Sequence, residues 1–443
     1  MSMLAQLLEG TPYISYTYAY PHKTAYRAFP EPVPVADLWQ HENRDAVFLY
    51  MHVPFCEMRC GFCNLFTTVD PAAQFMAGYL EALERQAQSV RGAVGELRVV
   101  RMALGGGTPT FLATTDLARL FAIAEKVFCV QPGSIPTSVE TSPLTATSEK
   151  LHLLREHGVD RISIGVQSFV ESEVRMAGRP QRTAVVEQAL DEIRNLAFPT
   201  LNIDLIYGLP GQTVESWLSS LRMALHYHPE ELYLYPLYVR PLTGLARTDV
   251  TPPCGKQDIR LACYRAACAL LLIEGYTQVS MRMFRSAHAP AQTGPVYCVQ
   301  DDGMIGLGCG ARSYTRTHHY SHEYAVGAAP IRSILHTYAA TPADAFAFAR
   351  HGYVLNSEEQ RRRYVLKSLL EAGGLSLLAY QRRFGSLALT DLSMLYELLD
   401  RGLATIAAEV MTLTKAGLER SDTIGPWLYS LHVRQLMEEY TIQ

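Results

Sequence analysis

The stretch that decides the fold reads Tyr50-Met-His-Val-Pro-Phe-Cys56-Glu-Met-Arg-Cys60-Gly-Phe-Cys63. It places three of the chain's nine cysteines within eight residues, at the spacing C-x3-C-x2-C. Thiolates are soft ligands that suit zinc or iron–sulfur clusters. A structural zinc ion normally takes four ligands. Three close cysteines without a fourth nearby therefore favour a [4Fe–4S] cluster with one open iron. The alternatives are zinc with a remote fourth ligand and three unrelated core thiols.

Outward from this stretch, short apolar runs alternate with amphipathic segments between about residues 46 and 240. We expect strands at 48–53, 99–104, 137–141, 161–166, 201–207 and 232–238, and helices near 71–92, 114–128, 147–157, 183–197 and 214–227. Apolar strands of this kind are typical of a parallel sheet that is covered on both faces. Eight such units close a barrel, so six predict an α/β fold with a partial (β/α)6 TIM-like barrel. Its chemistry should lie at the carboxyl ends of the strands.

The rest of the chain suggests three further parts. Residues 1–45 are rich in tyrosine and proline, and we expect an N-terminal wrap over the barrel of residues 46–240. The Gly-rich stretch within 241–350 predicts a barrel extension that holds a second ligand or the substrate. Residues 351–443 are predicted to form an α-rich C-terminal domain.

Composition limits the functional class. The 443 residues carry 39 basic and 43 acidic side chains, a net charge of −4, which makes no electrostatic case for nucleic acid or an anionic membrane. No apolar run reaches the about 18–20 residues that span a bilayer. The chain begins without the pattern of a signal peptide. We therefore expect a cytoplasmic protein, monomeric and with mostly free thiols.

A cysteine triplet that follows the first strand of a partial barrel resembles the radical S-adenosylmethionine (SAM) superfamily. The flanking residues 50–56 resemble its HemN-like branch, which contains oxygen-independent coproporphyrinogen III oxidase. The motifs at 105–110 (GGGTPT), 161–169 (RISIGVQSF) and 202–213 (NIDLIYGLPGQT) are also similar. The resemblance implies that SAM binds the open iron and that the reduced cluster cleaves it to a 5′-deoxyadenosyl radical. An electron donor such as flavodoxin or ferredoxin is then required.

The same resemblance implies roles for individual residues. Those expected at the bound SAM or beside the cluster are Tyr50, Phe62, Gly105, Gly106, Gly107, Thr108, Glu140, Gln167, Arg179 and Asp204. The glycines would let the backbone approach the methionyl amino group, and Arg179 would pair with the SAM carboxylate. Each residue also has a plain structural alternative, such as a tight turn, an exposed strand-end acid, a surface arginine or a core aromatic.

Departures from the family pattern bear on the reaction. Coproporphyrinogen oxidases typically have a fourth cysteine two positions after the third, where this chain has Leu65. The haem chaperones typically carry a histidine and a tryptophan in the region that reads 294-GPVYCVQDD-302 here. We therefore favour a HemN-like methylase or cyclopropanase that acts on an sp2 carbon of a small molecule. Such an enzyme binds two SAM molecules, and Gln300 is a candidate for the second site. Decarboxylation of coproporphyrinogen and tetrapyrrole binding without such chemistry remain the alternatives.

Overall fold

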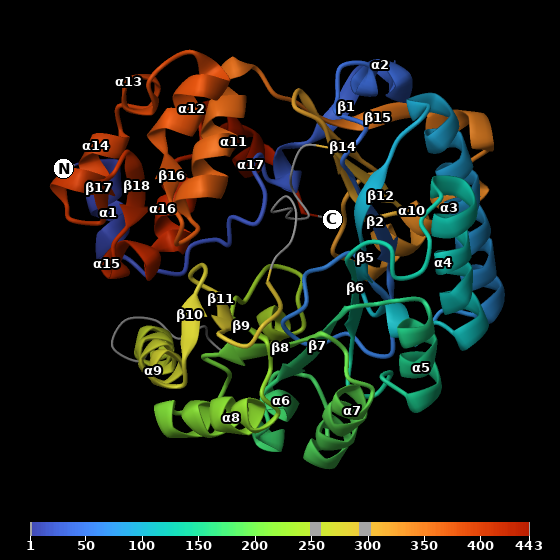
Figure 1. The fold of residues 1–443 in the computed structure, drawn as a ribbon, viewed down its shortest axis with the longest axis horizontal. Helices are drawn as coiled ribbons and strands as arrows, with labels where there is room; N and C mark the ends of the chain where they lie inside the picture. The colour runs from blue at the N-terminus through green and yellow to red at the C-terminus, as the bar shows by residue number, and fades with distance from the viewer. Residues whose placement is uncertain (1, 249–257, 292–302, 443) are drawn as a thin grey trace.

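The computed structural model describes residues 2–248, 258–291 and 303–442. A curved sheet of 13 strands runs through one lobe, and a second, mostly helical lobe lies beside its open side (Figure 1). The strand order is β1-β15-β14-β13-β12-β2-β5-β6-β7-β8-β9-β11-β10. The strands from β12 to β9 in this order are parallel to their neighbours. No helix in the described part of the chain is long and apolar enough to cross a bilayer.

The six predicted strands and the helices between them are confirmed. The strands are β2 (Val47–Val53), β5 (Val99–Gly106), β6 (Thr137–Thr141), β7 (Arg161–Gln167), β8 (Thr200–Tyr207) and β9 (Glu231–Pro236). The helices are α3 (Ala73–Val94), α4 (Thr114–Phe128), α5 (Ser148–Glu156), α7 (Thr183–Asn195) and α8 (Val214–His226), with the short α6 (Glu171–Met176) added after β7. These helices lie along the outer face of the sheet (Figure 1). The predicted α/β fold with a partial barrel of six βα units is therefore confirmed.

Side chains of β2 show how the two faces of the sheet differ. Leu49 and Met51 are fully buried in the large core that the sheet shares with the outer helices. Phe48 instead packs on Met304 and Tyr314, in a small cluster on the inner face. Because successive side chains of a strand point to opposite faces, Tyr50 also faces the barrel interior.

Both edges of the parallel sheet are extended by later segments. After α9 (Arg260–Ile273) and β10 (Tyr276–Gln278), strand β11 (Met283–Ser286) pairs antiparallel with β9. At the other edge β12 (Met304–Leu307) pairs parallel with β2, followed by β13 (Arg312–Tyr314), β14 (His318–Ser321) and β15 (Phe348–Val354). Helix α10 (Ala328–Ala340) lies between β14 and β15 in the sequence. The Gly-rich stretch thus contributes a seventh parallel strand that the sequence analysis did not predict.

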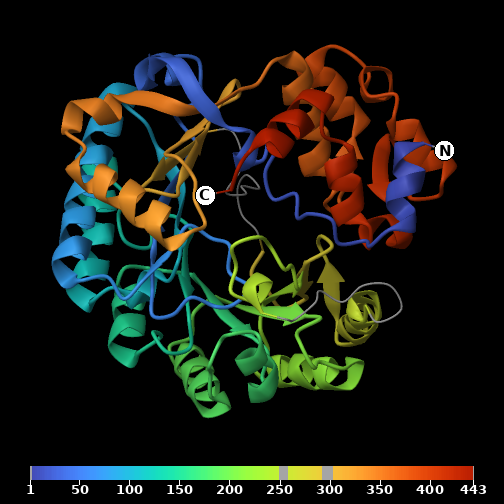
Figure 2. The same cartoon turned by 180° about the vertical axis from the view of Figure 1, so that it is seen from behind.

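The second lobe has its own core. It contains α11 (Ser357–Leu369), α12 (Leu377–Phe384), α13 (Ala388–Asp391), α14 (Leu395–Asp400), α15 (Lys415–Leu418), α16 (Ser421–Trp427), α17 (Leu431–Glu439) and the sheet β16 (Leu375–Ser376), β18 (Val410–Leu413), β17 (Ala404–Ala407). The N-terminal helix α1 (Met3–Glu9) is embedded in this lobe (Figure 2). Leu4, Tyr20 and Tyr26 belong to its core, whereas β1 (Arg27–Pro34) pairs with β15 of the large sheet. The first residues therefore belong to both lobes.

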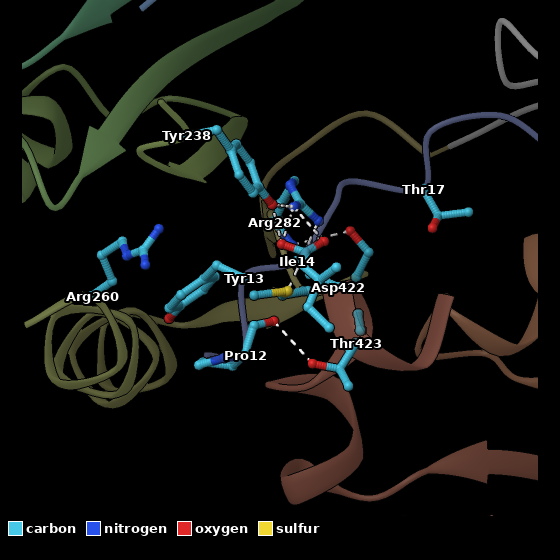
Figure 3. Close-up of polar contacts among 12 residues, drawn as sticks. Pro12, Tyr13, Ile14, Thr17, Tyr238, Arg260, Arg282, Asp422 and Thr423 are labelled. Atoms are coloured by element: carbon cyan, nitrogen blue, oxygen red, sulfur yellow. Dashed lines mark hydrogen bonds and ion pairs between the residues drawn. The ribbon is translucent and has the colours of Figure 1, made fainter. Parts of the chain in front are cut away.

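A buried ion pair joins the two lobes (Figure 3). Arg282, just before β11, donates to both carboxylate oxygens of Asp422 in α16, at 2.6 Å each. The Tyr238 hydroxyl also contacts both partners. Beside this pair, the Thr423 hydroxyl donates to the carbonyl oxygen of Pro12 at 3.2 Å. The N-terminal segment therefore passes through the interface between the lobes.

Candidate functional site

The three cysteines lie in a loop that is pinned at both ends. Strand β3 (Phe55–Cys56) pairs with β4 (Thr68–Val69), so residues 57–67 form a loop after β2 whose two ends are held together. Cys56 and Cys60 are buried, Cys63 is half-buried, and all three thiols are free. They lie at the carboxyl end of a parallel strand, which is where α/β folds of this type place their chemistry.

Gly61 fixes the middle of this loop. Its amide donates to the carbonyl oxygen of Ala177 at 3.0 Å, and its own carbonyl accepts from the amide of Leu245 at 2.7 Å. A Cβ at Gly61 would lie 2.6 Å from the Ala177 oxygen, so no larger residue fits without moving the backbone. Phe62 packs next to it against Ala177, Leu245 and other apolar side chains. Packing is therefore one role of Phe62. A contact between Phe62 and the bound SAM stays a prediction.

Two side chains donate hydrogen bonds to the thiol sulfurs. The Arg179 guanidinium donates to Cys60 Sγ at 3.0 Å and to the carbonyl oxygen of Gly165 at 2.8 Å. The Thr108 hydroxyl lies 3.6 Å from Cys56 Sγ. Burial raises the pKa of Cys56 to about 12, so this thiol keeps its proton unless a metal binds. Donors at the sulfurs would help to stabilise the thiolates that an iron–sulfur cluster requires.

The predicted glycines bring the end of β5 against both Cys56 and Glu140. The Gly106 amide donates to Glu140 Oε2 at 2.9 Å. A Cβ at Gly105 would lie 2.9 Å from the Glu140 carboxylate, and one at Gly107 would lie 2.8 Å from Cys56 Sγ. The absence of side chains here therefore creates a cradle that a Cβ would fill. Its donors and its three thiols fit a cluster with a bound amino-acid ligand.

Glu140 and Asp204 both lie on the interior face, on β6 and β8. Burial raises the pKa of Glu140 and raises that of Asp204 to about 7. Asp204 accepts hydrogen bonds from the Asn202 amide at 2.8 Å and from the Ser163 hydroxyl at 3.4 Å. Although it lies deep in the protein, Glu140 is solvent-accessible, as a side chain that faces an interior space would be.

Gln167 ends β7 in a left-handed conformation, with φ of 72°. The pairing of β7 with β8 shifts by one residue between Gly165 and Gln167. Such an irregularity redirects a side chain at the end of a strand. The structure places Tyr50, Glu140, Gln167 and Asp204 on adjacent parallel strands. Thr108 and Arg179 follow the ends of β5 and β7 and contact the cysteine loop directly. Gln300 lies outside the described residues.

The sequence analysis missed His52. Its ring lies 3.2 Å from the Tyr50 hydroxyl and 3.3 Å from the carbonyl oxygen of Phe66, at the far end of the cysteine loop. Burial lowers the pKa of His52 to about 4, so the ring is neutral. A Cβ at Gly106 or at Gly310 would lie 2.6 Å from this ring. The signal was present, since His52 stands inside the decisive stretch and both glycines stand in Gly-rich motifs.

Among residues 2–248, 258–291 and 303–442, no three His, Cys, Asp or Glu side chains converge closely enough to hold one metal ion. Assignment of an iron–sulfur cluster therefore depends on the thiol donor set, the cradle beside it and the protein family.

The chain is similar to known proteins over the barrel and beyond it. The model of the radical SAM superfamily matches residues 50–224. The haem chaperone HemW of Bacillus subtilis is 27% identical over 393 residues, which cover 86% of this chain and 99% of the relative. The oxygen-independent coproporphyrinogen III oxidase of Salmonella typhimurium is 27% identical over 433 residues, 91% of each chain. Among solved structures, coproporphyrinogen III oxidase (HemN) from Escherichia coli, itself a radical SAM enzyme, aligns with a TM-score of 0.73 and 23% identity, covering 94% of this chain and 97% of that one.

The family model and the cysteine loop show a radical SAM domain over residues 50–224, a domain that uses a [4Fe–4S] cluster and SAM. The HemN match shows that the fold is shared along nearly the whole chain. Along most of its length the chain is similar to HemN-like proteins, at 27% identity to both the haem chaperone and the oxidase.

Proposed function

We propose that this protein uses the radical chemistry of its superfamily to methylate or cyclopropanate an sp2 carbon of a small molecule. When bound, the cluster and SAM supply a 5′-deoxyadenosyl radical that abstracts a hydrogen atom. One observation carries the proposal of a radical enzyme: three free thiols, the Gly105–Gly107 turn and Glu140 meet at the carboxyl end of the parallel strands.

The chain's own residues would bind and orient the cofactors. Cys56, Cys60 and Cys63 would hold three irons. The backbone at Gly105–Gly107 and the Glu140 carboxylate would receive the methionyl amino group. Arg179 already lies at Cys60 and would pair with the SAM carboxylate.

The remaining predicted contacts complete the proposed site. Tyr50 would lie against the bound SAM, while Gln167 and Asp204 would contact it from the neighbouring strands. Because SAM carries a positive sulfonium and a positive amino group, the interior carboxylates suit it electrostatically. The N-terminal segment and the second lobe would keep water away from the radical.

Two departures from the patterns of the relatives bear on what happens to the substrate radical. Leu65 stands where the decarboxylating relatives typically have a cysteine, and residues 294–302 lack the chaperone's histidine and tryptophan. Both departures favour the methylase or cyclopropanase branch, in which a second SAM supplies the carbon. Gln300 would contact this second molecule, and a flavodoxin or ferredoxin would supply the electron to a monomeric enzyme.

A second candidate is oxidative decarboxylation of coproporphyrinogen III. It is favoured by the Salmonella oxidase, which aligns with 91% of this chain. Tetrapyrrole carriage is favoured in the same way by HemW, which aligns along 99% of its own length.

The first experiment tests SAM cleavage without a substrate. The protein is reconstituted anaerobically with iron and sulfide and is incubated with dithionite and SAM. We expect 5′-deoxyadenosine, and we expect none from Cys56→Ala. Cys129→Ser is the matched control, because Cys129 is an exposed thiol at the end of α4. Cleavage that persists in Cys56→Ala would overturn the proposed site.

The second experiment separates the candidate reactions. S-adenosylhomocysteine or methylthioadenosine formed together with 5′-deoxyadenosine would support transfer of a carbon from a second SAM. Release of CO2 from added coproporphyrinogen III, without either sulfur product, would overturn that choice in favour of the oxidase. Haem binding without SAM cleavage would favour the carrier.

A further inference from the structure

A group of basic side chains surrounds Tyr18 in the N-terminal segment. The Arg312 guanidinium donates to the Tyr18 hydroxyl at 3.1 Å, and its carbon lies 5.0 Å from the centre of the ring. Lys23 Nζ lies 6.0 Å from the same ring centre and 3.6 Å from that of Tyr324. His22 Nε2 lies 3.3 Å from the Tyr18 hydroxyl. Two cations and a histidine thus share one aromatic neighbour.

This basic group lies beside the cysteine loop. The Tyr324 hydroxyl, under Lys23, donates to the carbonyl oxygen of Asn64 at 2.6 Å, one residue after Cys63. Arg312 is on β13, two residues from Tyr314, which packs on the inner face next to Tyr50. Because residues two apart on a strand share a face, Arg312 also faces the interior. Lys23 and Arg312 keep partial solvent exposure, as side chains lining an interior space would.

Neither cation has an acidic partner among the described residues, in contrast to other arginines of the barrel. Arg161 pairs with Glu231 at 2.8 Å and Arg260 with Asp258 at 2.7 Å. Lys23 and Arg312 have only aromatic contacts and the Tyr18 hydroxyl. Burial, followed by the charge of Arg312, lowers the pKa of Lys23 well below its usual value, and the nearby Cys63 thiol opposes this shift. Buried charges are costly unless an opposite charge compensates them, so an anion bound here would stabilise both.

The interior is polarised around Tyr50. Apart from burial, the charge of Glu140 raises the pKa of Tyr50 and that of Arg312 lowers it. In the strand order, β6 and β8, which carry the carboxylates, lie to one side of β2, and β13, which carries Arg312, lies to the other. The carboxylate side suits the cationic groups of SAM. The cationic side suits a ligand of opposite charge.

We infer that Lys23 and Arg312 bind an anionic oxygen group, a carboxylate or a phosphate, of the small-molecule substrate. This inference builds on the proposed function, since it names the class of substrate that the same site receives. The group is distinct from Arg179, which lies at Cys60 and is the residue proposed for the carboxylate of SAM. A guanidinium and an ammonium together suit such a group, because the first offers a planar fork and the second a point charge.

The test measures anion binding to the reconstituted holoenzyme with saturating SAM present. Inorganic phosphate and acetate are titrated separately at constant ionic strength against chloride, and the unfolding midpoint Tm is recorded. We expect a saturable rise in Tm with at least one probe, and the stronger probe names the group. In Lys23→Met and Arg312→Met the half-saturating concentration should rise about 10- to 100-fold, as expected for loss of one charged hydrogen bond. Lys126→Met, an exposed lysine of α4, should respond as the wild type does.

A second readout separates a binding role from a structural one. Without added anion, Tm of Lys23→Met should equal or exceed that of the wild type, because the substitution removes an uncompensated charge. A clear fall in the Tm of Lys23→Met would overturn the inference. It would also be overturned if the Tm of the wild type showed no saturable rise with either anion, or if both variants responded to the anion as the wild type does. The titration is also performed without SAM. A response that is seen without SAM and is absent with saturating SAM would show that these cations bind the carboxylate of SAM, and would also overturn the inference. Formation of 5′-deoxyadenosine by the same proteins tests the proposed function independently.

Discussion

The ion pair between Arg282 and Asp422 supports a quantitative prediction about how the lobes hold together. Their side chains are 4% and 1% exposed, and the guanidinium carbon lies 3.8 Å from the centre of the Tyr16 ring. Asp422→Asn would keep the shape and leave the buried guanidinium without a counter-charge. Breaking one side of a buried pair costs about 3–5 kcal/mol. The equilibrium constant for opening this interface should therefore rise roughly 100- to 5,000-fold.

Hydrogen exchange of the α16 amides measures this opening, because helices at the interface exchange through local separation of the lobes. Trp427, in the same helix, offers fluorescence as a second probe. The double variant Arg282→Met, Asp422→Leu should be less destabilised than Asp422→Asn, because it removes both charges. An increase in exchange below about fivefold in Asp422→Asn would refute the reasoning, since it would mean that water already compensates Arg282.

Three further substitutions test the site. Gly107→Ala would place a Cβ 2.6 Å from the carbonyl oxygen of Phe55, so the iron and sulfide content after reconstitution should fall. The control Gly78→Ala, which has open space around the added Cβ, should keep its iron and sulfide content. Glu140→Gln can still accept from the Gly106 amide but loses the charge, so we expect weaker SAM binding by equilibrium dialysis with unchanged Tm. Asp204 has a folded pKa of about 7, above its unfolded value near 3.8, so the folded state binds the extra proton and stability falls as pH rises from about 4 to 7. Asp204→Asn should flatten this decline in the urea midpoint of the ligand-free protein, and parallel curves would contradict the assignment.

The parallel core could be predicted because its strands are encoded locally. Ile162 and Ile164 on β7, for example, are fully buried among helices that the sequence also marks by their amphipathic spacing. Strand β12 could not be found in this way. It has four residues, two of its neighbours in the sequence are glycines, and it joins β2 from more than 250 residues away. Pairing at that distance leaves no local periodicity to detect.

Strand β1 shows how a local rule can mislead. Its sequence, RAFPEPVP, contains three prolines, which normally argue against a strand because each lacks an amide donor. The structure places β1 at the edge of the large sheet, where prolines are tolerated. A sequence alone does not reveal which strand will be the edge.

Some features of the candidate site are also local in the sequence, whereas others arise only in the tertiary fold. The spacing of Cys56, Cys60 and Cys63 is local, and it favoured an iron–sulfur cluster before the fold was known. The position of His52 between two glycines more than 200 residues apart, and that of Arg179 at Cys60, depend on the tertiary fold. Residue type alone therefore indicated the cofactor more readily than the groups that surround it.

The N-terminal segment has a larger part in the site than a cover would have. Tyr16 lies edge-on to Tyr235 on the inner face of β9, at 6.3 Å between ring centres, and Lys23 lies over Tyr324 beside the cysteine loop. The barrel strands supply the groups suited to SAM, whereas this segment and β13 supply two cations that have no acidic partner in the described part of the chain. On this reasoning, the difference between this enzyme and its HemN-like relatives should be sought first at Lys23 and Arg312 rather than at the cluster.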